Sequence, residues 1–151
     1  MGLDMYLSAD KYLGDWNHSE PIERDRYRKI ASIVGLPGFR NDNSPSLTVS
    51  ISVLYWRKAY AIHDWFVRDG AGEWGEFYVS QKSLKALKDL CHEALASKDL
   101  LLLPPHDGFC SGSTDIDEYY WEDIKRTGKA LRKLLADERF ASWDFYYHSS
   151  W

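Results

Sequence analysis

Cysteine is scarce in this chain. Of its 151 residues only Cys91 and Cys110 are cysteine, and they do not form a CxxC pair. Two such residues provide neither a framework of disulfides nor a zinc site of four cysteines. Cys91 lies on the apolar side of a predicted helix, so we expect a small buried core residue there.

Long hydrophobic runs are also missing. Nowhere do eighteen apolar residues follow one another, as a bilayer-crossing helix requires. The first residues, MGLDMYLSADKY, lack the basic stretch and apolar run of a secretory signal. We therefore predict a cytoplasmic protein with no membrane partner.

The chain has no excess of positive charge. It carries 19 Lys and Arg against 23 Asp and Glu, a formal charge of −4, with a pI near 5.7. Such a chain repels a phosphate backbone, which argues against nucleic acid as a partner. Residues 20–29 hold the densest basic stretch, but acidic residues alternate with the basic ones, as on a solvated helix face.

Aromatic residues are abundant by contrast. The chain has seven Trp and ten Tyr, while 44% hydrophobic and 28% charged residues are ordinary for a globular protein. An aromatic ring can fill a core, stack on a ligand or anchor an interface, and composition does not separate these roles.

Four segments have the patterns of β-strands. Leu3, Met5 and Leu7 alternate with less apolar residues, and residues 47–53, LTVSISV, alternate apolar residues with Ser or Thr. Residues 76–79 predict a short strand. The aromatic end of the chain, residues 143–151, predicts a last one.

Four helices are predicted from apolar residues that recur at spacings of three and four. The first begins near Glu20, with Pro21 in its first turn, and ends before Gly35. Ser80 is the expected N-cap of the third helix. The predicted apolar faces, in chain order, are Ile22, Ile30 and Ile33; Tyr55, Ala59, Ile62 and Phe66; Leu84, Leu87, Leu90, Cys91 and Ala94; and Tyr120, Ile124, Thr127, Leu131 and Leu134.

These elements predict an α+β fold. The helices and strands do not alternate strictly, which favours a largely antiparallel sheet of about four strands packed with about four helices. The length fits one core, and we predict a single globular domain, a layer sandwich, over residues 1–151.

The segment 104–121, PPHDGFCSGSTDIDEYYW, concentrates the candidate chemistry. Gly and hydroxyl residues precede a helix start, where free amides favour an anion, but the acidic residues that follow and the absence of a P-loop lysine favour capping instead. Thr114 and Asp117 have the spacing of a capping box, with Asp in place of Glu.

Two catalytic interpretations of this segment remain open. The acidic cluster of Asp115, Asp117 and Glu118, with two further acids on the helix, has the ligand type of Mg²⁺ or Mn²⁺ and would serve phosphodiester hydrolysis, although its spacing does not single out a metal site. Cys110 with a histidine, His106 or His148, has the residue types of a nucleophile and base. Without a known contact we assign no catalytic residue, metal or cofactor.

A binding interpretation uses the same region and the aromatic residues with fewer geometric demands. Rigid rings and cations can contact a protein partner or a nucleotide base, although packing is expected to bury about half of them. The candidate binding residues are Trp56, Arg57, His63, Ser113, Thr114, Asp115, Asp117, Glu118, Tyr120, Trp121, Tyr147 and Trp151, with Tyr119 and Tyr146 as further aromatic candidates.

Five blocks of the sequence carry a resemblance. MGLDMYL, YWRKAYAIHDWFV, GEFYVS, SGSTDIDEYYWEDI and YYHSSW, in this order, resemble a family of small, mostly uncharacterised proteins of tailed bacteriophages and prophages. The resemblance implies a phage gene acting in a bacterial cytoplasm, where such accessory proteins often bind host components or counter host defence. It carries over no catalytic residue.

The sequence therefore favours binding over catalysis. The leading hypothesis is a phage accessory protein that binds a host macromolecule, a host protein above all, as a counter-defence or host-takeover inhibitor. The alternatives are a protein that sequesters a nucleotide-like small molecule and a metal-dependent phosphodiester hydrolase. An exposed aromatic patch would favour the first, and a deep aromatic-lined pocket with basic groups the second.

Overall fold

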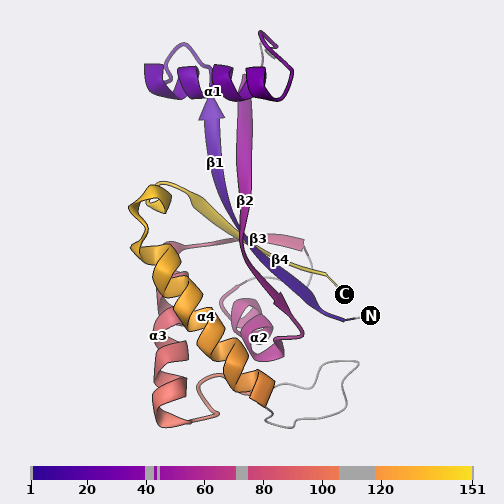
Figure 1. The fold of residues 1–151 in the computed structure, drawn as a ribbon, viewed down its shortest axis with the longest axis vertical. Helices are drawn as coiled ribbons and strands as arrows, with labels where there is room; N and C mark the ends of the chain where they lie inside the picture. The colour runs from indigo at the N-terminus through magenta and orange to yellow at the C-terminus, as the bar shows by residue number, and fades with distance from the viewer. Residues whose placement is uncertain (1, 40–42, 44, 71–74, 106–117, 151) are drawn as a thin grey trace. The chain divides into compact units, whose positions relative to one another are not determined.

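The computed structural model of this chain describes residues 2–39, 43, 45–70, 75–105 and 118–150. These residues form an α+β fold with a four-stranded antiparallel sheet in the order β2-β1-β4-β3 (Figure 1). The predicted fold class is confirmed. The strands are β1 (Asp4–Gly14), β2 (Ser46–Arg57), β3 (Gly75–Val79) and β4 (Asp144–Ser150), and the helices are α1 (Pro21–Ile33), α2 (Tyr60–Arg68), α3 (Gln81–Ser97) and α4 (Glu118–Ala136), with a 3₁₀ turn at Glu138–Phe140.

The chain groups into two compact units. Residues 1–9 and 52–151 make up unit 1, and residues 10–51 make up unit 2. Strands β1 and β2 each contribute residues to both units, so the grouping does not by itself divide the chain into two domains. Each unit is described by itself below.

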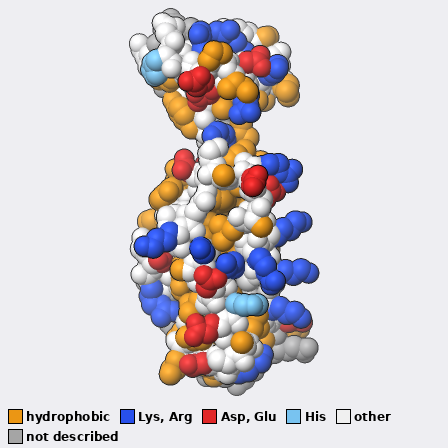
Figure 2. Space-filling view, turned by 90° about the vertical axis from the view of Figure 1, so that its left-hand side faces the viewer, with side chains coloured by type: hydrophobic (Ala, Val, Ile, Leu, Met, Phe, Trp, Pro, Cys, Tyr) orange, Lys and Arg blue, Asp and Glu red, His pale blue; other side chains and the backbone are white. Residues whose placement is uncertain are grey.

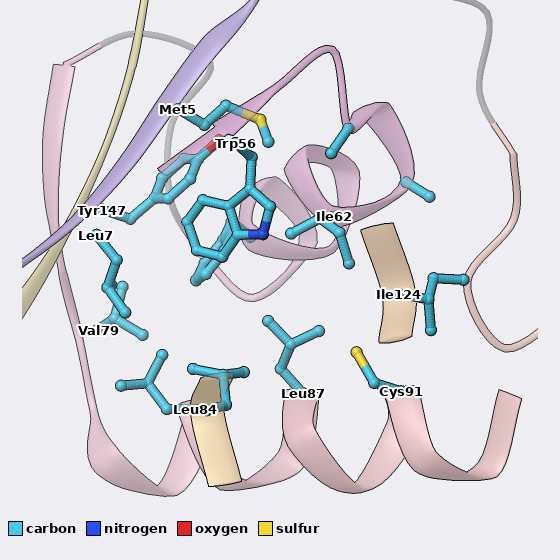
Figure 3. Packing of buried hydrophobic residues seen from close by; sticks show 14 of the residues in the cluster. Met5, Leu7, Trp56, Ile62, Val79, Leu84, Leu87, Cys91, Ile124 and Tyr147 are labelled. Carbon is cyan, nitrogen blue, oxygen red and sulfur yellow. The ribbon is translucent and has the colours of Figure 1, made fainter. Parts of the chain in front are cut away.

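The core of unit 1 lies between the sheet and the helices α2, α3 and α4 (Figures 1 and 3). Leu3, Met5 and Leu7 alternate inward from β1, as predicted, and Trp56 and Tyr147 are the largest side chains that are fully buried. The Trp56 indole nitrogen donates a hydrogen bond to Thr127 Oγ1 at 2.8 Å. Both polar groups thereby keep a partner in the core, where an unpaired one is costly.

Helices α3 and α4 pack against each other along their predicted apolar faces. Leu84, Leu87, Cys91 and Ala94 of α3 are buried, and Leu90 is half-buried. The α4 face is also confirmed: Ile124, Thr127, Leu131 and Leu134 are buried, and Tyr120 is half-buried.

The predicted N-cap of α3 is present. The Ser80 side chain accepts a hydrogen bond from the Ser83 amide at 3.0 Å, which satisfies one of the free N–H groups of the first turn. We expect Ser80→Ala to lower the free energy of unfolding by about 1 kcal/mol and Ser80→Asp to retain most of it. Urea unfolding followed by circular dichroism measures both, and an alanine variant as stable as wild type would contradict the cap's contribution.

The predicted second helix begins too early. Tyr55 belongs to β2, which continues to Arg57, and α2 begins only at Tyr60. The chain leaves the strand at Lys58, whose φ of 58° is left-handed and whose amide donates to the Leu3 carbonyl. Ala59, Ile62 and Phe66 pack in the core as predicted, but Tyr55 extends from a strand and is 45% exposed.

The predicted apolar face of α1 is also wrong. In unit 2 the helix spans Pro21–Ile33 as expected, but Ile22 and Ile33 are exposed and Ile30 is only half-buried. Tyr27 and Ala31 are buried instead. The buried face of the helix is therefore the one that carries Tyr27 and Ala31, and it is rotated from the face that carries the isoleucines.

A buried carboxylate organises unit 2. Asp15 is 5% exposed, and it accepts hydrogen bonds from Arg24 at 3.0 Å and Arg28 at 3.2 Å. Its amide donates to the Pro45 carbonyl at 2.7 Å. Two residues of the basic stretch thus neutralise one buried acid, while Lys29 pairs with Asp25 on the exposed side of α1.

Candidate functional site

The outward face of the sheet in unit 1 is the candidate functional site, and we call it the open face. Alternate residues of each strand point away from the core, because successive side chains of a strand leave on opposite faces. The core takes Met5, Leu7, Trp56, Phe145 and Tyr147. The open face takes Asp4, Tyr6, Tyr55, Arg57, Glu76, Tyr78, Tyr146 and His148.

Aromatic rings on this face form contacts from strand to strand. Tyr55 of β2 lies beside Tyr6 of β1, with ring centroids 5.1 Å apart, and Tyr6 stacks on His148 of β4 at 6.2 Å. Tyr78 of β3 packs edge-on against Tyr146 at 5.9 Å. The register explains this last contact, because Tyr78 is directly opposite Tyr146.

The rings remain accessible despite these contacts. Tyr6 is 37% exposed, Tyr55 45% and Tyr78 61%, and His148 is exposed as well. A row of part-exposed tyrosines offers apolar area with polar tips at little cost in side-chain entropy. All four strands contribute to it.

The charges on the open face are mainly negative. Asp4 and Glu76 lie on it, and the Glu76 position is directly opposite His148. The Tyr55 hydroxyl donates to Asp4 Oδ1 at 2.5 Å, and this hydrogen bond to a carboxylate raises the pKa of Tyr55. Arg57 supplies a positive charge near Tyr55. A face of tyrosines and carboxylates can hold cationic groups by ring and charge contacts together.

Three of the predicted binding residues lie in the core. Trp56 and Tyr147 are fully buried, and His63 is 6% exposed with its Nδ1 2.7 Å from the Tyr147 hydroxyl. Burial raises the pKa of Tyr147. Phe66 stacks on Tyr147 at 4.1 Å. Packing accounts for these rings, so we leave them out of the open face.

Two further predicted residues are half-buried at the beginning of α4. The Lys98 ammonium lies 4.3 Å from the Trp121 ring, and the Tyr120 hydroxyl donates to the Leu103 carbonyl. Burial raises the pKa of Tyr120. Both side chains link the beginning of α4 to the segment that follows α3. Tyr119, beside them, is 73% exposed.

Arg57 belongs to the open face, Glu118 begins α4, and the remaining predicted residues lie outside the described part of the chain. Ser113, Thr114, Asp115, Asp117 and Trp151 lie outside the described residues, as do His106 and Cys110, and Glu118 is described only as the first residue of α4. The capping box and the acidic cluster stay predictions. Within the part of the chain that the structure describes, no group of three His, Cys, Asp or Glu side chains is arranged to hold a metal ion.

The sequence missed most of the open face. Tyr6, Tyr78 and His148 were not predicted to bind, and Tyr146 was only one aromatic among several. The available signal was alternation: once Phe145 and Tyr147 are assigned to the core, Tyr146 and His148 must point outward.

In comparisons with known proteins, this chain matches no family model, no curated protein and no solved structure. Among the described residues, no helix is long and apolar enough to cross a membrane. The functional argument therefore depends on the site itself.

Proposed function

We propose that this chain is a phage-encoded accessory protein of the bacterial cytoplasm that binds a host protein on the open face. The observation that carries the proposal is the row of part-exposed rings of Tyr55, Tyr6 and Tyr78 across a sheet whose other side packs against helices. Large exposed aromatic surfaces are rarely retained without a partner, and Tyr is enriched among the residues that dominate interface energetics. The phage setting comes from the sequence resemblance.

Charge favours a protein over a nucleic acid as the partner. Asp4 and Glu76 lie among the tyrosines, and the chain as a whole is negative. A phosphate backbone is repelled by such a face, whereas Lys or Arg side chains of a protein are attracted to it. Blocking a host component by this contact is the counter-defence or takeover role that we propose.

Sequestration of a nucleotide-like molecule is less well supported. It calls for an aromatic-lined pocket with basic groups. A groove between α3 and α4 has the basic groups, but the described residues that line it include no Phe, Tyr or Trp side chain. The third hypothesis, a metal-dependent hydrolase, depends on Asp115, Asp117 and Glu118 and stays a prediction.

The test is a differential pull-down from host lysate. We expect the double variant Tyr6→Ala, Tyr78→Ala to lose the partner that wild type enriches, because truncating two interface tyrosines weakens binding by at least about tenfold. Tyr119→Ala is the control, since it removes from α4 a tyrosine that is more exposed than either Tyr6 or Tyr78. Mass spectrometry identifies both bound proteins and released small molecules.

The outcomes separate the hypotheses. A host protein captured by wild type and Tyr119→Ala but lost from the double variant supports the proposal. The same proteins captured by all three baits would contradict the open face as the site. A nucleotide released on denaturation, with no protein partner, would favour sequestration instead.

A further inference from the structure

A second surface of unit 1 has a different chemistry from the open face. A groove of about 670 Å³ runs between α3 and α4, within the size range of sites that hold ligands or peptide side chains. Figure 2 faces the side of the chain that carries these helices, and Lys and Arg side chains gather there. We call this surface the helical groove.

The α4 side of the helical groove is cationic. Lys125, Lys129, Arg132 and Lys133 line it from α4, and His92 lines it from α3. Arg132 and Lys133 follow Lys129 by three and four residues, and Lys129 follows Lys125 by four, which places the α4 cations on one side of the helix, along about 12 Å of its axis. No acidic residue is among the described lining residues.

These four cations are not in ion pairs, unlike several other Lys and Arg residues of the described chain. Arg126, on the same helix, pairs with Asp123 at 3.0 Å, and Arg139 pairs with Asp137 at 2.6 Å. Where the structure describes the chain, none of the four α4 rim residues is in an ion pair. A chain with a net charge of −4 thus carries a local positive stripe, although the charge of Lys133 also acts on the nearby Asp137 carboxylate.

The floor of the groove is apolar. Leu95, Ala96 and Ala136 line it together with the backbone at Gly128. A Cβ at Gly128 would lie 3.1 Å from the Cys91 Cβ, so the two helices approach closely there, and Leu95 is the only large apolar side chain among the described lining residues. Such a floor accommodates the apolar stripe of a third helix.

We infer that the helical groove is a docking site for an acidic amphipathic helix of a protein partner. Leucine-type side chains would lie on the floor between α3 and α4, and glutamates or aspartates beside them would reach the α4 stripe. A bare phosphate backbone matches the rim charge but has nothing to place on the apolar floor. The inference is independent of the open face and gives the chain a second binding surface.

The test uses a designed peptide of roughly 18 residues, long enough to be helical when bound, with leucines on one helical face and glutamates on the rest. A peptide of the same composition with the leucines scattered keeps the charge and removes the stripe. Fluorescence anisotropy measures binding of both peptides, and of a mixed-sequence single-stranded oligonucleotide, at about 50 and 300 mM salt.

The variants separate the groove from charge in general. Lys129→Glu with Arg132→Glu reverses the stripe at two exposed positions, and Glu retains helix propensity. Lys82→Glu with Lys85→Glu is the matched control, because it makes the same charge change at exposed α3 positions outside the groove lining. Circular dichroism establishes that both variants keep their helices.

We expect saturable binding of the amphipathic peptide to wild type and to the control variant. Binding should weaken at least about tenfold for Lys129→Glu, Arg132→Glu and for the scattered peptide. The inference is overturned if wild type shows no saturable binding, if the scattered peptide or the oligonucleotide binds as tightly, or if both double variants behave alike. Tyr6→Ala, Tyr78→Ala should bind the peptide normally, so failure here and failure of the open face are distinguishable.

Discussion

Replacing Trp56 with alanine is expected to lower the free energy of unfolding by about 3–5 kcal/mol, the range for removing a buried aromatic side chain. Trp56 is fully buried between the sheet and the helices, and its ring packs edge-on against Phe66 at 5.9 Å. The loss combines apolar burial with a cavity that the surrounding helices fill only in part. Urea unfolding followed by circular dichroism measures it.

A double-mutant cycle isolates the hydrogen bond in the same place. Trp56→Phe leaves the Thr127 hydroxyl without its donor, and Thr127→Val leaves the indole N–H without its acceptor, so each should cost about 1–3 kcal/mol. The double variant should cost less than the sum of the two, because the polar group stranded by each single change is then absent. Strict additivity would show that the bond contributes nothing to stability.

Replacing Asp15 with asparagine is expected to lower the free energy of local unfolding of unit 2 by about 1–3 kcal/mol. The change removes a buried charge that two guanidinium groups neutralise, although both arginines are part-exposed and regain water, which limits the loss. Hydrogen exchange by mass spectrometry should show faster exchange in α1 and unchanged exchange in α3. Asp25→Asn removes an exposed ion pair of the same helix and should have almost no effect.

The effect of Asp15 should depend on pH in a defined direction. Burial raises the pKa of Asp15, but hydrogen bonds from Arg24 and Arg28 outweigh it and hold the pKa below the ordinary value of 3.8. A depressed folded-state pKa stabilises the fold above the unfolded-state pKa, and the contribution is lost as the pH falls through the folded-state value. The difference between wild type and Asp15→Asn should therefore be constant near neutral pH and shrink below about pH 4. A difference that grows on acidification would contradict this assignment.

The sequence predicted α3 and α4 well because several signals agree there. Ser80 supplies a cap, and the apolar residues recur over about three turns of α3 and about four of α4, so the buried face follows from the period alone. A long periodic pattern depends little on its surroundings. The α+β class followed from the same elements.

The two errors arose where local pattern and tertiary context disagree. Tyr55, Ala59, Ile62 and Phe66 have helical spacing by coincidence, because the chain turns at Lys58 without the glycine that usually marks a left-handed residue. In α1, burial of Asp15 with its arginines requires that Arg24 and Arg28 face the rest of unit 2. The spacing of the isoleucines predicted the wrong buried face of α1, because the contact of the two arginines with Asp15 determines how the helix is oriented.

The open face could not be predicted from sequence because both faces of β4 have similar residues. In β4 both faces carry aromatic residues, Phe145 and Tyr147 on one side and Tyr146 on the other, so composition does not say which side is buried. Only the pairing with β1 and β3 decides it. A shift by one residue would exchange the binding and packing roles of every ring in the strand.

The close approach at Gly128 gives the protein an internal reporter. Burial raises the pKa of the Cys91 thiol to about 12, so a thiol reagent that needs the thiolate does not react with it while α3 and α4 are packed. In a Cys110→Ser background, the rate of Cys91 alkylation therefore reports how often the two helices separate. A ligand that bridges the helices should lower the alkylation rate, and a ligand that forces them apart should raise it.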